Sequence, residues 1–125
     1  MSGIVFFRTE NRAETVSFYT DRLGFDVWLE QEGGCTILSY DNLLVGFCDG
    51  TETETDGIVT VVLGDEAAVD DCHADLADVA TGRPEANDDF GIYQFFATDP
   101  DGRTVEVQAF QHETPSVAPN RNGSD

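Results

Sequence analysis

The chain has no lysine, only two histidines and three cysteines, and no long hydrophobic run. Its six arginines stand against 25 acidic residues, which gives a net charge of -19. Such a surface repels a phosphate backbone, so we expect no nucleic-acid partner. No segment approaches the about 20 apolar residues of a membrane span, and the first residues lack the basic start of a signal peptide. We therefore expect a cytoplasmic protein with no membrane partner.

The acidic residues are spread along the chain rather than massed in one block. With 40% hydrophobic residues and nine phenylalanines the chain can build a core, so its charge does not indicate disorder. This composition is typical of proteins from salt-accumulating halophiles, in which molar salt screens the repulsion between acids. The alternative is that the acids form a surface for a binding partner.

The three cysteines, Cys35, Cys48 and Cys72, are odd in number and widely spaced. They form no Cys-x-x-Cys pair, so neither a disulfide framework nor a zinc site is indicated. We expect small thiols that are buried or half-buried.

The hydrophobic pattern predicts the element order βαβββ twice, as an internal repeat of roughly 55 residues. Asn11 and Asp65 are expected to cap the two helices, and Gly24 to end the first. We expect strands at 4–9, 25–31, 35–40, 43–48, 58–63, 84–87, 91–98 and 103–110, and helices at about 12–23 and from 66 to about 80. This gives one domain over residues 1–112, with modules at about 3–50 and 57–111, and a flexible tail at 113–125.

A tight turn near the end of the chain, Asp99-Pro100-Asp101-Gly102, precedes a strand that carries Glu106. Polar and apolar residues alternate along this strand, so Glu106 lies on its polar face. If that face is exposed to solvent, Glu106 is an ordinary surface acid. If the face lines a cavity, the carboxylate can serve as a metal ligand or a base.

In the first repeat Phe18-Tyr19 leads by a helical turn to Leu23-Gly24-Phe25, and in the second the turn at 99–102 precedes Glu106. In order and spacing they resemble the vicinal oxygen chelate family, which includes glyoxalase I, extradiol dioxygenases, fosfomycin-resistance enzymes and bleomycin-binding proteins. The resemblance implies an α+β fold in which two βαβββ modules form a cup-shaped mixed sheet. It also implies a homodimer and a small-molecule ligand bound in the cup.

Metal-dependent members of this family hold their ion with four side chains from the first and last strands of each module. The resemblance places these positions at Ile4, Gly46, Ile58 or Val59, and Glu106. Only Glu106 offers a ligand atom, and one carboxylate holds a divalent ion weakly. We therefore expect no cofactor, and a divalent metal is disfavoured; if a metal binds, Glu106 is its ligand.

Side chains on the same strand face as these positions should point into the cup. The expected ligand-binding residues are Arg8, Phe6, Trp28, Tyr40, Thr60, Gln94, Phe96, Thr104 and Gln108. Arg8 could pair with Glu106 across the cup or bind an anionic ligand, or it could be a solvated arginine at the rim. The aromatic residues could equally belong to the core.

Two functions fit these features. The first is a metal-independent protein that binds a small organic molecule in an aromatic cup, as bleomycin-binding proteins do. The second is an enzyme: a glyoxalase-type lyase or isomerase, or a dioxygenase, in which Glu106 is the catalytic base or a metal ligand.

Overall fold

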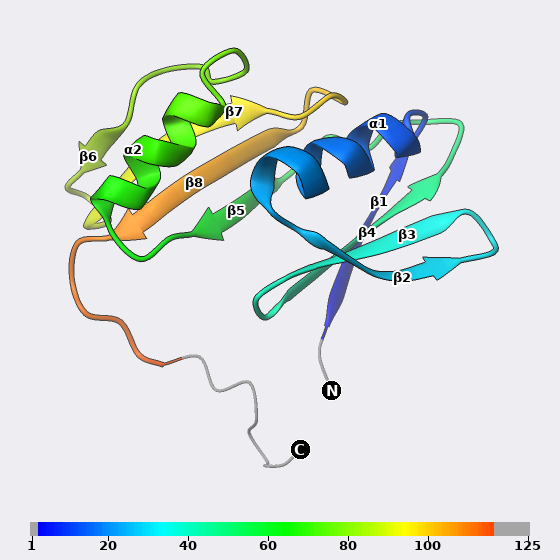
Figure 1. Ribbon diagram of the computed structural model, residues 1–125, viewed down its shortest axis with the longest axis horizontal. Helices are drawn as coiled ribbons and strands as arrows, with labels where there is room; N and C mark the ends of the chain where they lie inside the picture. Colours follow the sequence, from blue (N-terminus) through cyan, green and yellow to red (C-terminus); the bar gives the residue numbers. More distant parts are fainter. Residues whose placement is uncertain (1–2, 117–125) are drawn as a thin grey trace.

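Two four-stranded mixed sheets lie side by side in the computed structural model, which describes residues 3–116 (Figure 1). The first sheet has the strand order β1-β4-β3-β2 and the second has the order β5-β8-β7-β6. The elements are β1 (Ile4–Thr9), α1 (Arg12–Ser17), η1 (Phe18–Arg22), β2 (Asp26–Gln31), β3 (Cys35–Tyr40), β4 (Leu43–Asp49), β5 (Ile58–Val62), α2 (Glu66–Asp75), β6 (Glu85–Asn87), β7 (Ile92–Thr98) and β8 (Thr104–Phe110).

The two modules repeat one pairing scheme. In each, the first strand pairs with the last in parallel, and the remaining neighbours pair antiparallel. Parallel pairing needs a long crossover, which the helix and two intervening strands of each module provide. The predicted α+β class with two βαβββ modules is confirmed.

The first helix is shorter than the sequence predicts, because its second half adopts π-helical geometry. The Thr20 hydroxyl donates a hydrogen bond to the Val16 carbonyl inside this stretch, which competes with regular helical bonding. Asn11 stands at the start of α1 without a capping side-chain bond. Gly24 follows with φ of 81°, the left-handed conformation expected after the helix.

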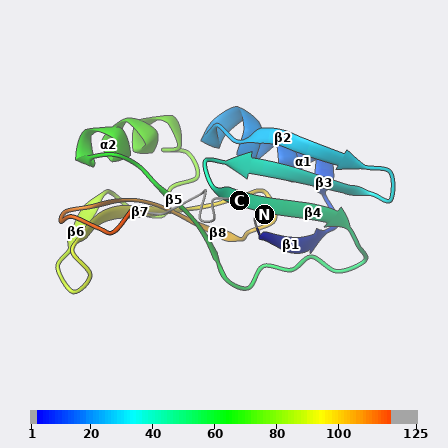
Figure 2. The same ribbon diagram turned by 90° about the horizontal axis from the view of Figure 1, so that it is seen from below.

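The second helix, α2, begins as predicted. The Asp65 carboxylate accepts a hydrogen bond of 2.8 Å from the Ala68 backbone N–H. The helix packs on β7 and β8, and its residues Val69 and the following Leu76 are fully buried in the core. Figure 2 shows α2 on one side of this sheet, which leaves the other side without a helix. Among residues 3–116, no helix is long and apolar enough to cross a membrane.

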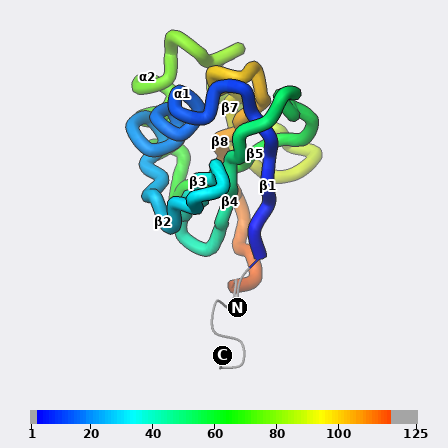
Figure 3. Tube along the Cα trace, turned by 90° about the vertical axis from the view of Figure 1, so that its right-hand side faces the viewer, coloured from blue at the N-terminus to red at the C-terminus, as the bar shows by residue number. Residues whose placement is uncertain are grey.

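One hydrophobic core joins the two modules. Phe18 and Tyr19 pack on the first sheet, while Val105 and Val107 of β8 belong to the same cluster. Tyr19 has no exposed surface and stacks on Phe47 with 5.0 Å between ring centroids. Figure 3 views the molecule from the end that carries the first module, where β1 runs along the sheet edge.

The prediction of three free thiols is wrong for two of them, because Cys35 and Cys48 form a disulfide. Strands β3 and β4 place them directly opposite each other, with 4.0 Å between Cα atoms. Spacing along the chain does not reveal such cross-strand neighbours. Cys72 is a free, half-buried thiol as predicted; burial and then the charge of Asp75 raise its pKa.

Residues 113–116 have no regular secondary structure, and the rest of the predicted tail, 117–125, lies outside the described residues.

Candidate functional site

The face of the second sheet turned away from α2 carries a cavity of about 480 Å³. Strand alternation positions its side chains: Val105 and Val107 face the core, so Glu106 and Gln108 face the cavity. Glu106 is 9% exposed and Gln108 is 8% exposed. A carboxylate and an amide are thus held, nearly out of contact with water, on the floor of this cavity.

Both carboxylate oxygens of Glu106 accept hydrogen bonds from uncharged groups. The Thr60 hydroxyl donates to Oε1 at 2.9 Å, and the Gln94 amide donates to Oε2. The Asn87 amide in turn donates to Gln94 Oε1 at 2.9 Å. The strand register explains these hydrogen bonds. Thr60 lies directly opposite Glu106 on β5, and Gln94 lies on β7 two residues before Phe96, which is opposite Glu106 on that side. The relay fixes the carboxylate and leaves lone pairs of both oxygens available to a ligand.

The walls of the cavity are apolar. Phe96 and Phe110 are 37% and 42% exposed, and Phe90 and Ile58 are also exposed to solvent. An apolar wall around a few fixed polar groups is the usual construction of a site for a small organic molecule.

The structure brings together five of the ten predicted site residues. They are Thr60, Gln94, Phe96, Glu106 and Gln108. Thr104 lies on the same strand face, opposite Ile58 and Thr98, but does not line the cavity. The sequence reasoning missed Phe110, although Phe110 shares the strand face of Gln108 and the alternation alone could have found it. It also missed Asn87 and Phe90, which reach the cavity from β6 and the following turn.

Of the alternatives for Arg8, the structure does not show the pair with Glu106, and the exposed arginine is the one that agrees with it. The Arg8 guanidinium lies 2.9 Å from Glu54, and its side chain is 60% exposed. This hydrogen bond raises the pKa of Arg8 and lowers the pKa of Glu54. The acidic linker after β4 supplies this nearer partner, so Arg8 lies outside the cavity of the second module.

Three other predicted residues of the first module do not reach this cavity. Tyr40 packs against Phe25, with 5.0 Å between ring centroids, beside the core, which agrees with the alternative that it belongs to the core. Trp28 lies at an irregularity in the pairing of β2 with β3 and is 54% exposed. Phe6 lies over Gly46, so that a Cβ atom on Gly46 would approach its ring to 2.5 Å.

The four metal positions implied by the family resemblance do not fit an ion. The Phe6 ring occupies the space where a side chain on Gly46 would begin. Ile4 and Ile58 offer no ligand atom, so Glu106 is the one position of the four with a side-chain oxygen. Within the described part of the chain, no three His, Cys, Asp or Glu side chains gather in a way that could hold a metal.

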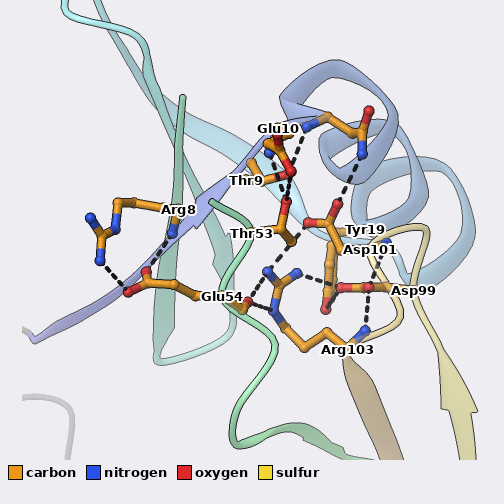
Figure 4. Close-up of polar contacts among 10 residues, drawn as sticks. Arg8, Thr9, Glu10, Tyr19, Thr53, Glu54, Asp99, Asp101 and Arg103 are labelled. Carbon is orange, nitrogen blue, oxygen red and sulfur yellow. Dashed lines mark hydrogen bonds and ion pairs between the residues drawn. The ribbon is translucent and has the colours of Figure 1, made fainter. Parts of the chain in front are cut away.

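A second polar cluster, centred on Arg103, joins the modules (Figure 4). The Arg103 guanidinium is fully buried, donates to Asp99 at 2.7 Å, and bonds the backbone carbonyl of Glu54. The Tyr19 hydroxyl donates to the same Asp99 carboxylate at 2.8 Å. Burial, followed by the charge and hydrogen bond of Asp99, raises the pKa of Tyr19. Sequence reasoning placed Arg103 only at the start of a strand, because the pairing spans 49 positions of the chain.

The chain matches no protein-family model and no curated protein. Solved structures are similar to it. A glyoxalase/bleomycin resistance protein/dioxygenase from Nocardioides has 17% identity and a TM-score of 0.70, over 94% of this chain and 89% of that one. Lactoylglutathione lyase from Agrobacterium tumefaciens has 16% identity and a TM-score of 0.72, over 89% and 94%.

An integron cassette protein from the Halifax Harbour sewage outfall metagenome has 16% identity and a TM-score of 0.75, over 88% of this chain and 98% of that one. Identities this low establish the fold and leave activity open. The protein therefore has the fold of the glyoxalase, bleomycin resistance and dioxygenase superfamily, built from two βαβββ modules.

Proposed function

We propose that the protein binds a small organic molecule, without a metal ion, in the cavity of the second module. The observation that carries this proposal is Glu106, fixed by Thr60 and Gln94 on the floor of a cavity with phenylalanine walls. The volume of about 480 Å³ lies within the range of small-molecule sites. Similarity to a bleomycin resistance protein in fold agrees with a binding role.

The alternative is an enzyme that uses Glu106 as a general base. The carboxylate is fixed in the cavity, as a base must be to reach a substrate proton. The fold similarity to lactoylglutathione lyase agrees with this alternative. It predicts that a bound compound is converted, and that Glu106→Gln abolishes the conversion while the compound still binds. A bound compound that remains unchanged over hours supports the binding role.

The proposed function is tested by ligand-detected NMR in molar KCl, with a panel of small aromatic compounds and protein dialysed against EDTA. We expect binding to persist after dialysis. Phe96→Ala should weaken it by about tenfold, because a phenylalanine wall contributes on the order of 1.5 kcal/mol of apolar contact. Trp28→Ala, which removes an exposed aromatic outside the cavity, is the matched control and should bind like the unaltered protein.

Two results would contradict the proposal. The first is stoichiometric nickel, zinc, manganese or iron in the purified protein, with binding that EDTA removes and the metal restores. The second is a Phe96→Ala variant that binds as well as Trp28→Ala.

A further inference from the structure

The Glu106 carboxylate forms no ion pair with a positive side chain of the described residues. The carboxylate is 9% exposed, and its two bonded partners, Thr60 and Gln94, are uncharged. No arginine or histidine lines the cavity within residues 3–116, and the chain has no lysine. Removing a carboxylate from water without a cation nearby is costly, and two neutral hydrogen bonds recover only part of that cost.

Four of the five arginines in the described residues are engaged elsewhere. Arg8 pairs with Glu54, Arg12 with Asp49, Arg22 with Asp78 and Arg103 with Asp99. The fifth, Arg83, lines a neighbouring pocket together with Glu85, Asp88 and Asp89, and not the cavity of Glu106.

Gln108 provides a second, independent observation. Its side chain lines the cavity, is 8% exposed, and makes no side-chain hydrogen bond to another residue in the described range. An amide that lines the cavity without a protein partner is free to bond a ligand. Its carbonyl oxygen can accept a hydrogen bond from a donor that also contacts Glu106.

The phenylalanines of the wall add a third element. Phe90, Phe96 and Phe110 line the same cavity as Glu106. Aromatic rings attract a cation through their negative faces, and they also pack against an apolar body. The net charge of -19 further attracts cations and repels anions over the whole surface.

We infer that the ligand of this cavity is an organic cation, an ammonium group on an apolar or aromatic body. The ammonium lies against Glu106 and Gln108, and its body packs against the phenylalanine wall. This inference rests on the proposed function and specifies its ligand class. It replaces the expectation that Arg8 binds an anionic ligand, since Arg8 lies outside the cavity and is paired with Glu54.

The test compares three probes of similar size by calorimetry in molar KCl: 2-phenylethylammonium, 2-phenylethanol and 3-phenylpropionate. High salt suppresses non-specific attraction to the acidic surface. We expect the ammonium to bind at least about tenfold more tightly than the alcohol, and the carboxylate to bind weakest. Glu106→Gln should reduce the preference for the ammonium to near unity. Glu32→Gln, which removes one charge from an exposed turn, should keep it.

The outcomes separate the two proposals. Equal affinity for ammonium and alcohol, or tighter binding of the carboxylate, overturns the cation inference and leaves cavity binding in place. Binding of none of the three overturns both. Retention of the preference in Glu106→Gln also overturns the inference. If circular dichroism shows that Glu106→Gln is unfolded, the order of the three affinities in the unaltered protein decides.

Discussion

Arg103 and Glu106 are two buried charges on one strand and its entry turn, but their environments are opposite. Arg103 lies between Asp99 and Asp101, with its guanidinium 4.6 Å from the Phe7 ring centroid. Its charge is thereby neutralised within the protein. Glu106 has only neutral donors, so its charge remains available to a ligand. At the scale of single residues, Arg103 stabilises the fold and Glu106 is suited to binding.

We expect Arg103→Met to destabilise the protein strongly. The substitution leaves the Asp99 and Asp101 carboxylates buried without their cation, which costs about 3–5 kcal/mol in comparable sites. The measurement is the free energy of unfolding from urea titration in molar KCl. Added salt cannot reach a fully buried pair, so the loss should persist at every salt concentration.

Arg22→Met is the control, because Arg22 also pairs with an aspartate, Asp78, but at the surface, where the two side chains are 34% and 66% exposed. Its removal should change stability far less. Similar losses in the two variants would show that the Arg103 cluster has no special role in stability.

At the scale of elements, local patterning predicted most of the fold. Alternation located β1 and β3 to the residue, and the Asp65 cap located the start of α2. Local patterning could not show the π-helical turn of η1, because that turn depends on how the Thr20 hydroxyl bonds within the packed helix. The disulfide was missed for a related reason, since it depends on the register between β3 and β4.

The pairing of β1 with β4 places Phe6 directly beside Gly46, and this supports a prediction about the two strands. Gly46→Ala should destabilise the protein by about 1 kcal/mol, because the new methyl group displaces the Phe6 ring. The loss is at the low end for overpacking, since Phe6 is half-exposed and can move outward. Thermal or urea unfolding measures it.

The double variant Phe6→Ala with Gly46→Ala removes the clash. Its loss in the free energy of unfolding should therefore be smaller than the sum of the losses in the two single variants, which a double-mutant cycle measures. Strictly additive effects would mean that the two side chains do not compete for the same space.

At the scale of the whole molecule, five of the ten predicted site residues lie together at one cavity. The residues on β5, β7 and β8 share one sheet, so alternation sufficed to group Thr60, Gln94 and Glu106. Alternation alone does not show how the two sheets lie relative to each other. The possible contact between Arg8 and Glu106 depended on that arrangement, and in the structure Arg8 bonds the linker residue Glu54.

The helix-free faces of both sheets are nearly without acids. Phe6 and Gly46 lie on that face of the first sheet, and Ile58, Phe96 and Phe110 on that of the second, where Glu106 is buried. In a chain of charge -19 these are the surfaces on which two copies can meet with least repulsion. We propose that a second copy covers them in a homodimer.

Sedimentation at about 0.1 M and about 1 M KCl tests the dimer, because the Debye length falls from about 10 Å to about 3 Å between these concentrations. We expect the dimer fraction to rise with salt. Phe6→Glu, which adds an acid to the open face, should shift the equilibrium to monomer. Ala74→Glu on the exposed side of α2 should not. A monomer at both salt concentrations would exclude the dimer.

The Arg103 cluster also determines whether the chain can be opened, or its two modules separated, at the linker between them. One acceptor of Arg103 is the backbone carbonyl of Glu54, in the linker between the modules, so no side-chain substitution at position 54 removes it. Circular permutation that opens the chain in this linker would displace that carbonyl and leave the buried guanidinium without this acceptor. A half-gene that encodes the second module alone would lack both the carbonyl and the Tyr19 hydroxyl. We therefore expect the two repeats to depend on each other for folding, although each has the full βαβββ order.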